Sequence, residues 1–208
     1  MHATLPKWRI SGFESRLPHQ PTTKGLILTC IVAVKDGKTI YMGADSAGSG
    51  GGYTESRKDP KVWVDGEFIY GFTSSFRMGA ILRYHFKPPR RGKLSVDAYM
   101  NTRYVDELMQ TLSDNWWIED KTAKAEGGTF IVGYAGRIFC VQSDFQVGET
   151  RDKYYSVGSG SWHALGSLFS TEGLLQSPEQ RVKIALRASA KFTTTVEPPF
   201  KIVKLENK

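Results

Sequence analysis

Short apolar runs separated by turn-forming residues make up much of the first third of the chain. They lie at residues 27–34, 39–45, 61–64 and 67–72. The first pair is joined at residues 35–38 by Asp36-Gly37 and the second pair by Asp65-Gly66. Asp-Gly between two β-type runs is the preferred sequence of a tight hairpin turn. The pattern therefore predicts two antiparallel hairpins, with a Gly/Ser-rich turn at 46–52 between them.

Helical spacing of apolar residues, at intervals of three and four, follows the second hairpin. It predicts helices at residues 76–87, 95–117, 161–170 and 178–192. Further strands are predicted at residues 129–133, 137–141 and 200–205. Ser177, Pro178 and Gln180 form a strong helix start, because serine caps the helix, proline suits its first position and glutamine can return the cap.

The element order is hairpin, hairpin, two helices, hairpin, two helices and a final strand. Hairpins build antiparallel sheets, and helices inserted in blocks should cover their outer faces, which indicates an α+β fold. A four-layer αββα sandwich is one arrangement that fits, although the order alone does not select it. Residues 1–26 show no period and should form an N-terminal extension or propeptide, with residues 27–208 as one domain.

The net charge of +7 raises the question of nucleic-acid binding. The densest basic patch, residues 87–93, contains two prolines and a glycine, which indicates a solvated loop, and no nucleic-acid motif is present. Cys30 and Cys140 lie in apolar runs and do not form a disulfide framework. No run has the length of a membrane span, and no metal-binding spacing or cofactor motif is found. We therefore expect a cytoplasmic protein without cofactor or metal.

Three residues of complementary chemistry lie at strand ends. Thr29 is near the start of the first strand, Asp45 at the end of its hairpin partner, and Lys61 at the start of the next hairpin. Antiparallel pairing brings the start of one strand to the end of the next, so Thr29 and Asp45 can be neighbours. A hydroxyl becomes a useful nucleophile beside a base, and a lysine held by a carboxylate supplies positive potential. On spacing alone, a purely structural role for these common residues remains open.

The stretch of sequence from Thr29 to Ala47 resembles the opening of proteasome β subunits and of the related bacterial two-component protease subunit. The intervals of sixteen residues from Thr29 to Asp45 and thirty-two to Lys61 match that family without a gap. Residues 71–77 resemble its oxyanion loop and helix start, and residues 156–161 resemble its glycine-serine signature. The likeness spans about residues 27–205 and is strongest to proteasome-like proteins of bacterial and phage genomes.

The resemblance implies an αββα N-terminal-nucleophile hydrolase that acts on peptides or unfolded proteins. Thr29 would attack the substrate carbonyl, with its own α-amine, freed by removal of the preceding residues, as general base. Lys61 paired with Asp45 would lower the proton affinity near the nucleophile, the backbone amide of Ser75 would stabilise the oxyanion, and Ser159 would orient the threonine. It also implies a homo-oligomer, a ring or stacked dimers, with an unfoldase as a further partner.

The sequence departs from the family pattern at three places. Leu28 precedes the nucleophile where family precursors carry glycine, and Ser75 replaces a glycine at the oxyanion position. The helix end at residues 188–195 is expected to lack the acidic residue and serine that support the family's threonine, with threonines at 193–195 in their place. A catalytically silent structural subunit that keeps its N-terminus is therefore the alternative.

Cys30 is the rival nucleophile, because it is adjacent to Thr29 and chemically competent. Neighbouring residues of a strand point to opposite faces, so Thr29 and Cys30 cannot both face Lys61. The resemblance favours Thr29 and predicts that Cys30 packs in the core.

Overall fold

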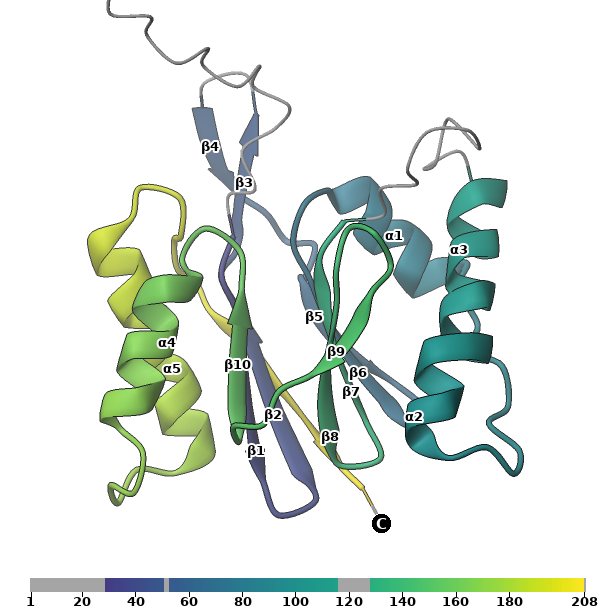
Figure 1. Ribbon diagram of the computed structural model, residues 1–208. Helices are drawn as coiled ribbons and strands as arrows, with labels where there is room; N and C mark the ends of the chain where they lie inside the picture. Colours follow the sequence, from purple (N-terminus) through teal and green to yellow (C-terminus); the bar gives the residue numbers. More distant parts are fainter. Residues whose placement is uncertain (1–28, 51–52, 116–127, 208) are drawn as a thin grey trace, which may run out of the picture.

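The protein folds into four layers, with two antiparallel sheets packed face to face and helices on both outer faces (Figure 1). The computed structural model describes residues 29–50, 53–115 and 128–207. The α+β sandwich expected from the sequence is therefore confirmed. The predicted extension at 1–26 lies outside the described residues.

The first sheet has four strands in the order β10 (Tyr154–Val157), β1 (Ile31–Asp36), β2 (Thr39–Ala44) and β11 (Lys201–Glu206). The second has five, in the order β5 (Val62–Asp65), β6 (Phe68–Phe72), β7 (Phe130–Tyr134), β8 (Arg137–Val141) and β9 (Val147–Glu149). A separate hairpin pairs β3 (Ala47–Gly50) with β4 (Tyr53–Ser56). All these pairings are antiparallel, as the hairpin pattern predicts.

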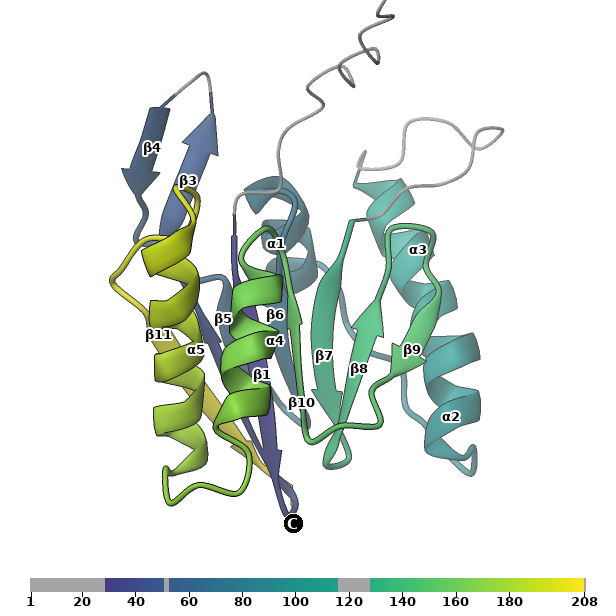
Figure 2. The ribbon, with the colours of Figure 1, turned by 60° about the vertical axis from the view of Figure 1, so that its left-hand side comes forward.

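The helices divide between the two outer faces, as Figure 2 also shows. On the four-stranded sheet lie α4 (Ser161–Ser170) and α5 (Pro178–Phe192). On the five-stranded sheet lie α1 (Phe76–Tyr84), α2 (Val96–Tyr99) and α3 (Val105–Asp114), with a π-helical turn, η1 (Met100–Tyr104), between the last two. The capping box predicted for α5 is present, since Ser177 Oγ accepts from the N–H of Gln180 and the Gln180 side chain accepts from that of Ser177.

Strand β1 is buried on both faces, which explains its unbroken apolar sequence. Ile31 and Ala33 face the space between the sheets, whereas Val32 and Val34 pack beneath α4 and α5. The same alternation assigns Cys30 to the helix side. A residue at position 29 is therefore directed to the space between the sheets.

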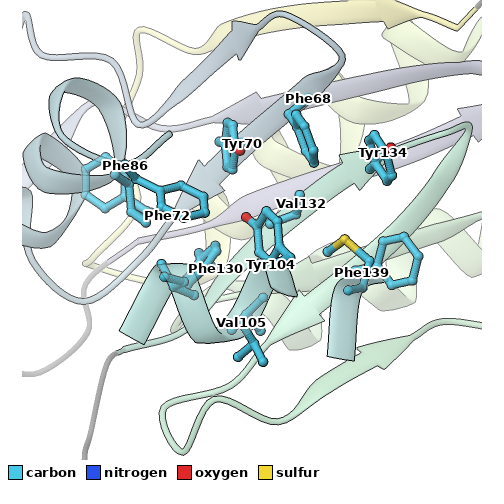
Figure 3. Close-up of a cluster of buried hydrophobic side chains, with 14 of the residues drawn as sticks. Phe68, Tyr70, Phe72, Phe86, Tyr104, Val105, Phe130, Val132, Tyr134 and Phe139 are labelled. Carbon is cyan, nitrogen blue, oxygen red and sulfur yellow. The ribbon is translucent and has the colours of Figure 1, made fainter. Parts of the chain in front are cut away.

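The layer beneath α1 and α3 is rich in aromatic residues, many of them drawn in Figure 3. Phe68 stacks on Tyr134 with ring centroids 4.3 Å apart, and Phe86 meets Tyr104 edge to face at 5.2 Å. Offset and edge-to-face pairs of this kind add to the stabilisation gained by burying the rings. This layer is filled by large side chains rather than by a polar network.

Several elements differ from the sequence-based expectation. The residues predicted as a turn at 46–52 include β3, because glycine and serine have a low strand preference that conceals a short pairing. Strands β9 and β10 were not predicted; they are short, and β10 forms only by pairing with the distant β1. Helix α1 ends at Tyr84 rather than at 87, since prolines at 88 and 89 cannot continue it. The long helix predicted at 95–117 ends at Asp114, and its last two positions lie outside the described residues.

Candidate active site

One end of the space between the sheets gathers the three predicted residues. Thr29 lies just before β1, Asp45 just after β2 and Lys61 just before β5. The register that pairs Ile31 with Ala44 brings the start of β1 beside the end of β2. Antiparallel pairing and sheet packing thus bring together residues that are well separated in the sequence.

The ammonium group of Lys61 joins the other two side chains. Its Nζ donates to Thr29 Oγ1 at 2.8 Å and to Asp45 Oδ2 at 2.9 Å. The side chains of Lys61 and Asp45 are 2% and 0% exposed, so this is a buried ion pair. A buried charge persists only when it is paired and hydrogen-bonded, and here both conditions are met.

Asp45 also fixes the backbone around Thr29. Its Oδ1 accepts the N–H of Cys30, and its Oδ2 accepts the N–H of Ala47, each at 2.9 Å. One carboxylate therefore connects the chain beside Thr29, the start of β3 and the Lys61 ammonium. These three contacts account for the burial of Asp45 better than a role as a turn cap would.

Burial lowers the pKa of the Lys61 ammonium, and the attraction of Asp45 partly opposes that shift. The ammonium is thus poorly solvated, and its hydrogen bond to Thr29 Oγ1 takes the place of water. Such a cation stabilises negative charge on the hydroxyl oxygen more strongly than a hydrated lysine can, because the local dielectric constant is low.

The loop before α4 holds the backbone of Thr29. Ser159 Oγ accepts the N–H of Thr29 at 3.2 Å and donates to the Thr29 carbonyl at 3.3 Å, and the N–H of Gly160 also reaches that carbonyl at 3.3 Å. Ser159 and Thr195 hydroxyls lie 2.7 Å apart. Either hydroxyl can be the donor in that pair, because each carries one proton and can also accept.

Gly158 lets this loop approach Thr29 closely. Its φ is +99°, and a Cβ placed there would overlap the Thr29 carbonyl carbon at 2.8 Å. Both the left-handed backbone and the close contact require glycine. The glycine-serine segment therefore serves to hold Thr29.

Ser75 is bonded differently from what its predicted role requires. Its backbone N–H donates to the Thr73 carbonyl at 2.9 Å, and Ser74 between them has a φ of +68°. This is a γ-turn of the rare, positive-φ type. The Ser75 side chain caps α1 by accepting from the N–H of Arg77. In this structure the Ser75 amide, which was predicted to bind an oxyanion, therefore forms its hydrogen bond within its own loop.

Cys30 lies on the opposite side of the strand from Lys61, as alternation predicts. It is fully buried, and its Sγ donates to Ser189 Oγ at 3.3 Å. Burial raises the pKa of the Cys30 thiol to about 11, so the thiol is neutral at physiological pH. A neutral, enclosed thiol is a poor nucleophile.

Two supporting residues were missed in the sequence. The expectation that residues 188–195 lack a serine is wrong, because Ser189 Oγ donates to the Gly160 carbonyl at 2.8 Å and so supports the loop that holds Thr29. The feature that could have indicated the role of Ser189 was its position on the apolar face of α5, in line with Val182 and Ala185. Thr195, one of the expected threonines, contacts Ser159, which the sequence did not indicate.

A cavity of about 230 Å³ lies beside this site, lined among others by Pro60, Phe72 and Phe76. The Phe76 ring centroid is 5.8 Å from Lys61 Nζ and 4.2 Å from the Arg57 guanidinium carbon. Within the described ranges, no group of three or more His, Cys, Asp or Glu side chains could hold a metal ion. The same ranges contain no helix long and apolar enough to cross a membrane.

Comparison with known structures identifies the fold as that of proteasome-like N-terminal-nucleophile hydrolases. The chain is similar to Thiobacillus denitrificans BPH, at 24% identity and a TM-score of 0.73, over 86% of this chain and 98% of that one. The same protein in complex with epoxomicin gives 22% identity and a TM-score of 0.70 over the same shares. HslV from Trypanosoma brucei gives 16% and 0.63, over 86% and 100%. No protein-family model and no curated protein sequence matches the chain.

Proposed function

We propose that this protein is a threonine-type peptidase or amidohydrolase, with Thr29 as its nucleophile after the residues before it are removed. The observation that carries the proposal is the 2.8 Å hydrogen bond from Lys61 Nζ to Thr29 Oγ1 within a buried ion pair. A structural lysine would ordinarily keep its ammonium in water, because burying a charge is unfavourable. Its placement against a hydroxyl therefore favours a chemical role.

In the proposed reaction, Thr29 Oγ1 bonds to the carbonyl carbon of the substrate amide while its proton passes to the Thr29 α-amine. The amine of the substrate leaves with that proton as the C–N bond breaks, which produces an ester on Thr29. Water then attacks the ester and gives a proton to the same α-amine. As the ester C–O bond breaks, the α-ammonium returns that proton to Oγ1, which releases the acid and restores the Thr29 hydroxyl. The nitrogen involved lies 3.2 Å from Ser159 Oγ, which would orient it.

The other site residues act on charge and position in this proposal. The Lys61 ammonium, held by Asp45, stabilises the developing alkoxide of Thr29. The backbone N–H of Ser75 donates to the substrate oxyanion once its hydrogen bond to the Thr73 carbonyl is exchanged for this one. The cavity beside Phe76 receives a substrate side chain. Peptides or unfolded proteins are the proposed substrates, delivered to a homo-oligomer, with an unfoldase as a further partner.

A catalytically silent subunit is the second candidate, and two observations favour it. Leu28 stands where the family has glycine, and the Ser75 amide is hydrogen-bonded within its own loop. While Leu28 remains attached, the nitrogen of Thr29 is an amide and cannot act as a base. The chain would then serve in assembly only.

The deciding experiment compares two forms of the protein, one of full length and one beginning Met-Thr29, from which methionine is readily trimmed. Hydrolysis of fluorogenic peptide amides should appear only in the trimmed form and should vanish in its Thr29→Ala variant. Cys30→Ala, which changes the rival nucleophile, should keep most of the activity. Equal hydrolysis by both forms, or full activity in Thr29→Ala, contradicts the mechanism.

Epoxomicin provides a second readout, because Thiobacillus denitrificans BPH has been solved in complex with it. We expect a mass increase equal to one epoxomicin on the trimmed form and none on its Thr29→Ala variant. Absence of hydrolysis and of epoxomicin binding in a trimmed, folded protein would favour the silent subunit.

A further inference from the structure

The cavity beside the candidate active site has a basic lining. Its charged lining residues are one carboxylate, Asp59, and three cations, Arg57, Lys58 and Arg83. A second cavity, of about 530 Å³, shares Arg57 and Lys58 with the first and adds Lys201, and no Asp or Glu is among the described residues that line it. Two adjoining cavities therefore present more positive than negative charge.

The charge of Arg57 is already compensated by carboxylates. Its Nη2 lies 2.6 Å from Asp59 Oδ2, and its Nη1 lies 3.1 Å from Glu55 Oε1. Its guanidinium carbon is 4.2 Å from the centroid of the Phe76 ring, so Arg57 forms part of the cavity wall. The Asp59 carboxylate is thus bound within that wall, and Lys58 and Arg83 are the lining cations left to attract a ligand.

Aromatic rings, rather than a carboxylate, hold the Arg83 side chain. Its guanidinium carbon is 5.2 Å from the Trp63 ring centroid and 5.9 Å from that of Tyr84. None of the ion pairs between described residues includes Arg83 or Lys58. A ring face positions a guanidinium through cation–π attraction but leaves its net charge in place. A positioned, partly buried guanidinium without a counter-ion is suited to bind a carboxylate, which it can hold through two parallel hydrogen bonds.

Helix α1 sets the length of side chain that the cavity accepts. Phe76, Ala80 and Arg83 follow at intervals of four and three, so they share one face of the helix, and all three line the cavity. The Phe76 ring centroid is 5.8 Å from Lys61 Nζ, and the small Ala80 side chain leaves space beside it. Arg83 begins about 10 Å farther along the helix axis, and long side chains on a helix lean back toward its N-terminus. A glutamate side chain therefore fits, with its methylene groups against Phe76 and Ala80 and its carboxylate at Arg83.

We propose that this cavity selects substrates with an acidic side chain, glutamate above all, and that Arg83 determines this selectivity. The inference rests on the proposed function, because it names the side chain that the cavity receives when Thr29 acts on a peptide. It also gives the net charge of +7 a role, since a basic protein attracts acidic peptides from a distance. Acidic peptides are accordingly the substrate class.

Hydrolysis of matched peptides tests the selectivity in the trimmed form of the protein. Three fluorogenic peptide amides differ only in the residue before the reporter group, which is Glu, Gln or Lys. We expect kcat/KM for the Glu peptide to exceed that for the Gln peptide about tenfold, because a hydrogen bond between two charged groups is stronger than one to a neutral amide. The Lys peptide should be the poorest of the three. Equal values for the Glu and Gln peptides overturn the proposal.

Substitution of Arg83 tests the residue assigned to this selectivity. Arg83→Gln should reduce the Glu-to-Gln ratio of kcat/KM to about one and keep the value for the Gln peptide, which also shows that the variant is folded. Arg83→Lys keeps the charge without the planar fork and should retain part of the preference. Arg187→Gln is the matched control, because it removes the same charge from an exposed arginine on α5, and it should keep the wild-type ratio. A preference that survives Arg83→Gln, or one that Arg187→Gln abolishes equally, overturns the role of Arg83.

Binding separates this inference from the hydrolytic mechanism. In the Thr29→Ala variant of the trimmed form, fluorescence polarisation with labelled peptides that end in Glu-amide or Gln-amide measures recognition without turnover. We expect a Kd about tenfold lower for the Glu peptide, and the difference should vanish when Arg83→Gln is added. If the trimmed protein hydrolyses no peptide but this difference is found, the proposed function fails and the acidic subsite stands. Equal Kd values, or no binding of either peptide, overturn the subsite.

Discussion

Two buried regions of this protein are built on opposite principles. At one end of the space between the sheets, Asp45 and Lys61 form a polar site in which the carboxylate and the ammonium have defined hydrogen-bond partners. Beneath α1 and α3, stacked rings such as Phe68 and Tyr134 fill the volume (Figure 3). The aromatic region depends on size and shape, whereas the polar site depends on the identity of each atom. Substitutions that keep shape and change chemistry should therefore separate the two.

Asp45→Asn should give the largest effect on stability. The side chain keeps its size, but Lys61 loses its buried counter-charge and an amide NH₂ would face donors that the carboxylate now accepts. We expect a loss of about 3–5 kcal/mol in the free energy of unfolding, measured with urea. Its control is Glu55→Gln, which removes a carboxylate from an exposed pair and should change stability by less than about 1 kcal/mol. A loss below about 1 kcal/mol for Asp45→Asn would mean that Lys61 is neutral in the folded protein.

The double variant Asp45→Asn/Lys61→Met should be less harmful than the sum of its parts. Removing both charges leaves neither one buried alone, so the second substitution should recover about 1–3 kcal/mol relative to additivity. A double-mutant cycle of urea unfolding measures this coupling. Strict additivity would show that the ion pair seen at 2.9 Å does not control the stability of this region.

Phe130→Leu should be tolerated far better, although Phe130 is as deeply buried as the ion pair. An apolar replacement of similar size costs about 1–2 kcal/mol when neighbours can relax around it. The same urea experiment checks it. A loss as large as that of Asp45→Asn would remove the distinction between the two regions.

The smallest expected effect concerns Cys30, which adjoins the polar site but faces the apolar side. Its pKa is raised from 9.0 to about 11, so the unfolded thiol ionises first as the pH rises. Between pH 9 and 10 the unfolded state therefore binds fewer protons, and this group should reduce stability by about 1 kcal/mol. Cys30→Ala should lack that part of the decline in pH-dependent unfolding. An identical decline in both proteins would place the thiol in a solvated environment.

Local sequence patterns predicted the hairpin turns and the start of α5, because these features depend on a few neighbouring residues. The hairpin turns follow from Asp-Gly at residues 36–37 and 65–66, where both glycines have positive φ, and the α5 start follows from Ser177 and Gln180. Strand β10 could not be read this way, because it is formed by pairing with β1. Tertiary pairing overrides weak local preference in such short segments.

The site was predictable only in part, for a related reason. The order of strand ends and hairpins predicted that Thr29 lies near Asp45. The interval to Lys61 supported a shared site only through the family resemblance. The bonds between Thr29 and Ser159 cross 130 residues, and those of Ser189 to Gly160 cross 29, so no local period reports them. The hydrogen bond of the Ser75 amide to the Thr73 carbonyl accompanies a positive φ at Ser74, which residue type alone does not reveal.

The position of β1 has a consequence for time scales. The strand is covered on both faces and paired at both edges, so its amide hydrogens should exchange only when most of the domain opens. Thr29 is separated from this strand by Cys30 alone, whereas Ser74 and Ser75 lie in a loop with exposed or partly exposed side chains. The two sides of the site should therefore relax at very different rates. We expect hydrogen exchange to show β1 amides that are protected over hours, whereas the loop at Ser74 and Ser75 should rearrange within milliseconds or less.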